Sequence, residues 1–146
     1  MIKEKLPQNV SINDANKTPA IHAPTAIGIL LNLFCGINLI NKKVIIIGDF
    51  NSNSIWDKWD RWWNHSDVIN ELKELNIISL YHEKFNEKQG KESKPTFYLQ
   101  RKIEKPYHID YIFLSQQLIN DKTILEIGDK DYWLKNSDHL PLFIDL

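Results

Sequence analysis

The sequence predicts an α/β domain of the layered α+β type, in which helices cover sheets. Three observations lead to this fold class: a run of β-branched residues at 43–48, an amphipathic helix that opens at Ser66 and Asp67, and a series of short β segments after it. A strand, a helix and then several strands are typical of domains whose layers share one core. A chain of 146 residues is long enough for one such domain and too short for two.

The segment 43–48 (KVIIIG) has the strongest strand pattern. Its β-branched residues leave no polar side that could face water, so we expect a central strand covered on both faces. In the helix that follows, Val68, Leu72 and Leu75 recur at helical spacing, and Asn76 is expected to end it in a left-handed conformation.

Further β segments are expected after the helix, at 77–81, 96–99, 109–114, 123–127 and 140–145. Between the first two of them, the segment FNEKQGKESK at 85–94 is rich in charged residues and is expected to be a surface loop.

The chain before the first strand is harder to place. Residues 1–17 are polar and lack a sustained period, so we expect a loosely ordered lead-in, with the domain at 18–146. Thr25 is a suitable N-cap for an apolar helix over 26–40, which is too short to cross a bilayer because a span needs ~20 residues. No membrane association is expected. A single cysteine, Cys35, cannot form an internal disulfide, which favours a reducing cytoplasm.

The overall charge limits the possible partners. Eighteen basic and nineteen acidic residues give a net charge of -1. This balance argues against a protein that binds nucleic acid through bulk charge alone, although a local basic patch is compatible with it.

Three short segments place polar side chains at the ends of apolar strands. The first carries Asp49 and Asn51, the second Asp110, and the third Asp138 and His139. Carboxylates hold a divalent cation and orient water, an imidazole fixed by a carboxylate transfers a proton, and an amide bonds to a developing oxyanion. Together the segments predict hydrolysis of a phosphate ester. Taken singly, the first is also a good turn and the third a good cap.

In their order along the chain, GDFNS (48–52), HIDYIFLS (108–115) and SDHLPLFIDL (137–146) resemble the three late motifs of the endonuclease/exonuclease/phosphatase (DNase I-like) family. The resemblance runs from about residue 43 to residue 146 and covers the C-terminal half of the family domain. It implies a partial DNase I-like β-sandwich flanked by helices and lacking much of the N-terminal sheet. It also implies a metal-dependent phosphodiester hydrolase that is closest to nucleases.

The resemblance implies a role for each matching residue. Asp49 would orient or deprotonate the attacking water, and Asn51 would bind the scissile phosphate. Asp110 would hold the imidazole of His139, which would contact the phosphate or act as acid and base. Asp138, together with Asp49, would bind Mg²⁺ or Mn²⁺, the ions that suit hard oxygen ligands.

Four more residues are candidates for contact with a phosphodiester substrate such as nucleic acid. His22 lies in a segment with a weaker family likeness and is otherwise a loop histidine. Arg61 and Trp62 belong to an aromatic and basic segment (SIWDKWDRWWNHSD), a composition typical of nucleic-acid binding, in which Trp56 alternatively anchors the loop. His108 is either a substrate contact or a strand-end histidine. DNA, RNA, a lipid or a small phosphate ester all remain open as substrates.

One expected residue is missing from the family pattern. The family's principal metal ligand is a glutamate on an earlier strand, and Glu4 has no apolar strand around it. A site without that ligand should hold Mg²⁺ weakly, and a missing sheet leaves apolar strand faces bare. The chain is therefore a truncated hydrolase with doubtful activity on its own, a non-catalytic binding module, a half that a complementing N-terminal chain completes, or a homodimer.

Overall fold

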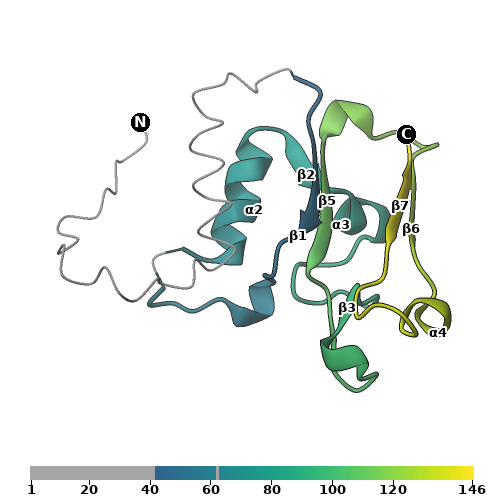
Figure 1. The fold of residues 1–146 in the computed structure, drawn as a ribbon. Coiled ribbons are helices and arrows are strands. Elements are labelled where there is room, and N and C mark those ends of the chain that lie inside the picture. Colours follow the sequence, from purple (N-terminus) through teal and green to yellow (C-terminus); the bar gives the residue numbers. More distant parts are fainter. Residues whose placement is uncertain (1–41, 62) are drawn as a thin grey trace, which may run out of the picture.

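The computed structural model describes residues 42–61 and 63–146, and Figure 1 shows their fold. This part of the chain is a small mixed α/β structure with antiparallel sheets and three α-helices. The strands are β1 (Ile45–Asp49), β2 (Ile77–Ser79), β3 (Phe97–Tyr98), β4 (Pro106–Tyr107), β5 (Asp110–Ser115), β6 (Ile124–Ile127) and β7 (Leu142–Asp145). The helices are α2 (His65–Glu74), α3 (Leu80–Phe85) and α4 (Lys130–Trp133), with 3-10 turns η2 (Ser54–Trp56), η3 (Leu99–Arg101) and η4 (Gln116–Leu118).

Some expectations cannot be compared with this structure. The lead-in at 1–17, the apolar helix at 26–40, the cysteine within it and His22 all lie outside the described residues. Among the helices of the described ranges, none combines the length and the apolar character of a membrane span.

The largest sheet has the order β1-β5-β2, with antiparallel pairing on both sides of β5. The expectation that the 43–48 segment forms a central strand is therefore wrong for the described residues, where β1 pairs only with β5. Its side chains alternate: Ile46 packs into the core, whereas Ile45 is 47% exposed and Ile47 is 56% exposed. Both faces of the strand are apolar in the sequence, but among the described residues only the face of Ile46 is packed into the core.

Two apolar clusters lie on opposite faces of this sheet. On one face, Tyr111 and Phe113 of β5 pack against Val68 and Leu72 of α2. On the other face, Ile112 and its neighbours on β5 pack against α3, β6 and β7. Figure 1 shows the resulting layers, with α2 on one side of the sheet and the β6–β7 hairpin on the other. Strand β5 thus lies in the middle of the structure, with both faces buried.

The helix α2 confirms the expected amphipathic pattern, but it begins at His65 and not at Ser66. Asn64 and Asp67 form a capping box, because the Asn64 side chain accepts from the N3 backbone and Asp67 accepts from the Asn64 N–H at 2.7 Å. Val68 and Leu72 are buried on the sheet side. Asn76 follows the helix with φ of 57°, the left-handed conformation that was expected.

The segment 77–81 is a strand only in part. β2 ends at Ser79, and the chain continues as α3 instead of extending to residue 81. Leu80, Tyr81 and Phe85 all belong to the apolar cluster that includes side chains of β6 and β7. This is possible because a helix places residues four apart, such as Tyr81 and Phe85, on the same side. The short helix was missed because its apolar residues directly continue those of the strand.

Candidate functional site

The end of β1 and the start of β5 bring two predicted site residues together. Asp49 and Asp110 are direct partners in the β1–β5 ladder, and side chains of opposed residues project from the same face. That face also carries Ile112, which packs toward β6 and β7. His139 lies just before β7 and forms an isolated antiparallel bridge to β3. The three polar segments predicted from the sequence thus meet at one end of the sheet.

His139 and Asp110 form a hydrogen-bonded pair. Nδ1 of His139 lies 3.1 Å from Oδ1 and 3.0 Å from Oδ2 of Asp110, and because an ionised carboxylate only accepts, Nδ1 carries the proton. The other nitrogen, Nε2, lies 3.9 Å from Oδ2 of Asp49. The Asp110 side chain is 15% exposed and the His139 side chain 32% exposed, so a ligand has access to the imidazole while its carboxylate partner is largely covered.

Burial sets the electrostatics of the pair. It raises the pKa of Asp110, and hydrogen bonds from Thr96 and His139 offset part of this rise. A carboxylate that is costly to ionise in isolation gains most from a partner that donates a proton.

Thr96 supports both members of the pair and was not predicted as a site residue. Its fully buried Oγ1 accepts from the N–H groups of Ile109 at 3.1 Å and Asp110 at 3.0 Å, and its carbonyl accepts from the N–H of Leu140 at 2.7 Å. The residue therefore joins the start of β5 to the segment of His139. The available sequence signal was a small polar residue at the start of an apolar strand, which is easily read as a strand end.

Asp49 and Asn51 form a tight turn after β1. The N–H of Asn51 donates to Oδ1 of Asp49 at 2.8 Å, and Nδ2 of Asn51 donates to Oδ2 at 2.9 Å. Asn51 has φ of 46°, a left-handed value that asparagine tolerates. The turn geometry that the sequence left as an alternative is present, and it places the exposed amide of Asn51 against the carboxylate that faces His139.

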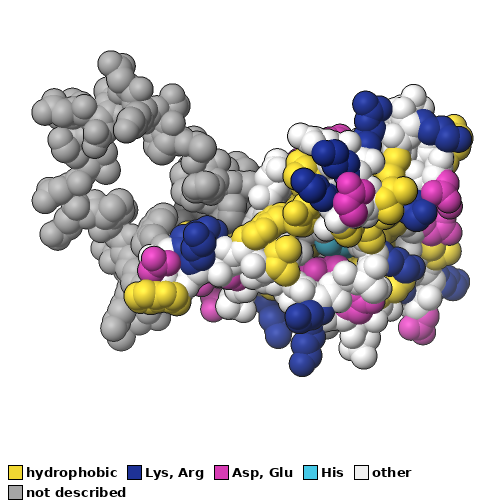
Figure 2. Space-filling view, turned by 90° about the horizontal axis from the view of Figure 1, so that it is seen from below, with side chains coloured by type: hydrophobic (Ala, Val, Ile, Leu, Met, Phe, Trp, Pro, Cys, Tyr) yellow, Lys and Arg dark blue, Asp and Glu magenta, His cyan; other side chains and the backbone are white. Residues whose placement is uncertain are grey.

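Two hollows meet at this turn. One, of about 360 Å³, is lined by Asp49, Asp110 and His139 together with apolar side chains that include Ile47 and Trp133. The other, of about 450 Å³, begins at Asn51 and is lined by Ser52, Asn53, Ile55, Trp56, Asp57, Lys58 and Arg61. Figure 2 views the molecule from the end where β1 stops, and there a histidine lies beside acidic and hydrophobic side chains, with Lys and Arg side chains around them.

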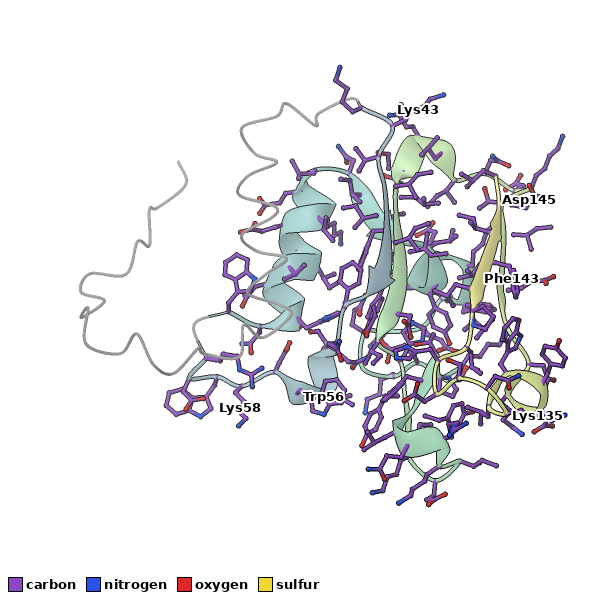
Figure 3. All side chains as sticks on the ribbon, viewed as in Figure 1. Lys43, Trp56, Lys58, Lys135, Phe143 and Asp145 are labelled. Carbon is purple, nitrogen blue, oxygen red and sulfur yellow. The ribbon has the colours of Figure 1, made fainter. Side chains whose placement is uncertain are left out.

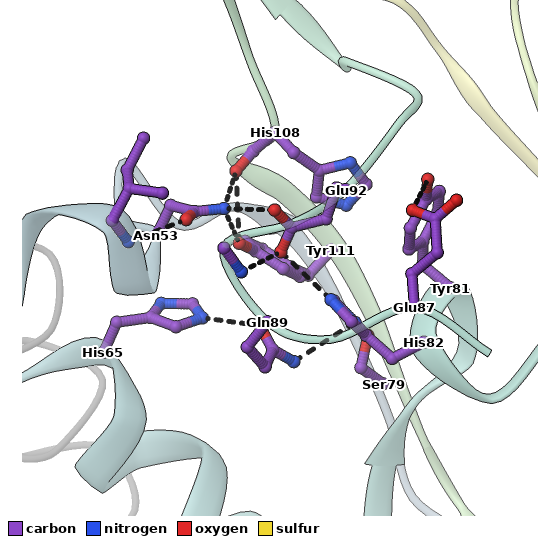
Figure 4. Close-up of polar contacts among 12 residues, drawn as sticks. Asn53, His65, Ser79, Tyr81, His82, Glu87, Gln89, Glu92, His108 and Tyr111 are labelled. Atoms are coloured by element: carbon purple, nitrogen blue, oxygen red, sulfur yellow. Dashed lines mark hydrogen bonds and ion pairs between the residues drawn. The ribbon is translucent and has the colours of Figure 1, made fainter. Parts of the chain in front are cut away.

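The segment that follows this turn takes part in a buried polar network, which Figure 4 shows. Asn53 Nδ2 donates to the carbonyl of His108 at 2.9 Å, to the hydroxyl of Tyr111 at 3.0 Å and to Glu92 at 3.2 Å. Glu92 also accepts from the N–H of Gly90 at 2.9 Å and contacts Nε2 of His82 at 3.0 Å. The network ties the 51–57 segment to the start of β5.

Glu92 is an exception within the expected charged surface loop at 85–94. Its side chain is only 4% exposed, whereas Lys88, Lys91 and Lys94 are exposed. Burial disfavours its ionised form, but hydrogen bonds from His82, the N–H groups of Gly90 and Glu92, and Asn53 outweigh burial and lower its pKa to about 2. Glu92 is therefore a buried, ionised residue that holds the loop in place. The many charged residues around it in the sequence gave no sign that this one is buried.

The other predicted residues are more scattered. His108 is buried, donates from Nδ1 to the carbonyl of Lys94 at 2.8 Å and has its pKa lowered by burial, which favours the strand-end alternative over substrate contact. Arg61 lines the larger hollow, and Trp62 lies outside the described residues. Asp138 is half-buried, and its carboxylate has no hydrogen bond or ion pair with a described residue.

In 42–61 and 63–146, no three His, Cys, Asp or Glu side chains form a metal-ligating group. Mg²⁺ commonly uses one or two protein carboxylates with water and substrate phosphate. Asp49 offers such a carboxylate, and water and a substrate phosphate would supply the other positions.

Comparison of the chain with protein-family models, with curated proteins and with solved structures gave no match.

Proposed function

We propose that the chain is the C-terminal half of a DNase I-like phosphodiesterase and that it acts in hydrolysis of a phosphodiester bond, as a nuclease. The observation that carries this proposal is the hydrogen-bonded Asp110–His139 pair, with Nε2 of His139 directed to within 3.9 Å of Asp49. A carboxylate, an oriented imidazole and a second carboxylate beside an open hollow are the groups that such a reaction uses.

Each side chain has a separate task in the proposed reaction. Asp110 keeps the proton of His139 on Nδ1, so that Nε2 is the nitrogen that faces the substrate. Asp49 orients the attacking water and accepts its proton as the water oxygen bonds to phosphorus. The unprotonated Nε2 of His139 accepts a hydrogen bond from the same water and so helps to orient it. The amide of Asn51 donates to a phosphate oxygen as its charge grows. The bond from phosphorus to the leaving oxygen breaks, and that oxygen takes a proton from solvent water.

Mg²⁺ or Mn²⁺ is part of the proposal but not of these steps. When bound, a divalent ion would neutralise charge on the phosphate. Asp49 and Asp138 are the ligands that the family likeness implies, and no described group of three ligands supports a preformed site. We therefore expect weak metal affinity, and we assign the steps above to the side chains of this chain alone.

Turnover of bis-p-nitrophenyl phosphate and of plasmid DNA tests the proposal. Purified protein should hydrolyse both with Mg²⁺ or Mn²⁺ at millimolar levels and lose activity in EDTA. Asp49→Asn should lower the rate by about 10²–10³, because the water loses its orienting base. The matched control is Asp121→Asn, which removes an exposed carboxylate outside both hollows and should retain the wild-type rate. Cleavage that persists in EDTA would contradict the metal-dependent mechanism.

A second candidate function is that of a half-domain completed by another chain. The observation in its favour is the bare side of β1, where Ile45 and Ile47 are 47% and 56% exposed and the strand has one paired edge among the described residues. Phe143 of β7 is also exposed (Figure 3). Exposed apolar side chains beside an open strand edge are suited to pairing with a further strand.

Sedimentation velocity separates a homodimer from a half that awaits a different chain. Under the second candidate, wild-type protein should dimerise or bind the dye ANS, whereas Ile45→Lys with Ile47→Lys should be monomeric and bind little dye, because lysine blocks edge pairing. Ile103→Lys, on an exposed apolar residue away from β1, is the control and should behave as wild type. A wild-type monomer that binds no ANS would rule out an uncovered interface.

A further inference from the structure

The larger hollow carries two cations without an ion-pair partner in the described residues. Lys58 and Arg61 both line it, and neither takes part in a salt bridge within 42–61 and 63–146. Asp57 lines it too, but its carboxylate accepts from the N–H groups of His65 at 2.9 Å and Ser66 at 3.1 Å, at the start of α2. The negative charge is thus already compensated by the helix N-terminus, and the positive charges are left for a ligand.

The same hollow has one aromatic wall. Trp56 packs against the ring of Tyr107 at a centroid distance of 5.3 Å, and this contact holds its indole in place. The residue is 39% exposed, so part of the indole is open to a ligand. Figure 3 shows Trp56 and Lys58 on neighbouring parts of the segment that follows β1. An open indole beside two cations matches a planar base and the phosphate attached to it.

The position of the hollow relates these groups to the proposed reaction. Asn51 lines it at one end, and the same residue is bonded to Asp49, which faces His139. A phosphate held at Asn51 would therefore have its neighbouring nucleotide in the hollow. The volume of about 450 Å³ is within the range of small-ligand sites.

From this arrangement we infer that the hollow is a subsite for the nucleotide next to the scissile phosphate of a single-stranded nucleic acid, with Lys58 and Arg61 on its phosphate and Trp56 on its base. The inference names the substrate class of the proposed phosphodiesterase and rests on that function for the identity of the scissile position. It also explains how a chain of net charge -1 binds a polyanion, since the attraction is local.

Oligonucleotide binding in EDTA tests the subsite without turnover. The probe is a fluorescein-labelled thymidine oligomer, read by anisotropy over a salt series. Lys58→Gln with Arg61→Gln should weaken binding about 10-fold and lower the salt slope by about 1.4, since each single-strand phosphate contact contributes ~0.7. Lys73→Gln with Lys122→Gln makes the same change in net charge at exposed positions outside both hollows and should keep the wild-type slope.

Base stacking is tested by an abasic oligomer of the same length. Removing the bases should weaken binding to wild type by about 5-fold or more, and it should matter much less in Trp56→Leu. The subsite would be overturned if the Lys58/Arg61 double variant and the Lys73/Lys122 double variant lost the same affinity for the oligomer. It would also be overturned if removing the bases weakened binding to Trp56→Leu as much as binding to wild type. Turnover of bis-p-nitrophenyl phosphate, which has one phosphate and no base, reports separately on the proposed function, so either idea can fail while the other stands.

Discussion

Replacing Asp110 with Asn is expected to slow phosphodiester hydrolysis by about 10²–10⁴. The carboxylate accepts the Nδ1 proton of His139 at 3.0 Å, and an amide in the same place can turn its NH₂ group toward the ring and favour the other tautomer. Nε2 would then carry the proton in the ground state. The rate is measured as kcat for bis-p-nitrophenyl phosphate with saturating Mg²⁺, with circular dichroism to show that the variant is folded.

A double-mutant cycle shows whether the two residues act as one unit. His139→Ala should lose about as much rate as Asp110→Asn or more, and the combined variant should lose no more than His139→Ala alone. If the two losses multiply, Asp110 has a task independent of His139 and the proposed pairing is wrong. Because burial raises the pKa of Asp110, the acidic limb of the wild-type rate should lie above the ordinary aspartate value of 3.8.

Glu92→Ala is expected to lower the free energy of unfolding by about 3–5 kcal/mol. The carboxylate is 4% exposed and accepts from His82, the Gly90 N–H and Asn53, so its removal leaves several buried donors without an acceptor. Urea unfolding followed by tryptophan fluorescence at pH 7 measures the change. Glu104→Ala, at an exposed position, is the matched control and should stay within about 0.5 kcal/mol of wild type.

The same residue predicts how stability depends on pH. The pKa of Glu92 is about 2 in the folded protein against 4.5 for a free glutamate, so ionised Glu92 stabilises the fold above about pH 4.5. This contribution is lost as the pH falls from 4.5 toward 2. Over that window the stability gap between wild type and Glu92→Ala should shrink, and a gap that stays constant would show that Glu92 acts without its charge.

Much of the fold followed from local patterns in the sequence. The helix α2 was predictable because Val68 and Leu72 recur at helical spacing and Asn76 offers a left-handed stop, although its N-cap is Asn64 and not a residue at the expected start, Ser66 and Asp67. The strands from β5 onward coincide with apolar segments bounded by turns. The edge position of β1 among the described strands was not predictable, because periodicity reports how apolar a strand is and not whether another segment lies against it.

The reactive side chains of the candidate site were predictable from the sequence, but the residues that hold them in position were not. Asp110 and His139 stood out because polar residues at the ends of apolar strands are costly unless they have a partner. Thr96 and Glu92 did not stand out, since their roles depend on contacts with residues distant along the chain. Local composition places Glu92 in a charged loop, and only the tertiary structure shows that its side chain points inward while the lysines of the loop are exposed.

The antiparallel pairing of β1 with β5 has a kinetic consequence. These strands are joined by a long connection that holds α2, β2, α3, β3 and β4, so their ladder forms only after a large loop has closed. Non-local pairing of this kind slows folding. Asp49 and Asp110 form the rung nearest to that connection, and their juxtaposition therefore depends on closure of the whole connection and not on any local contact.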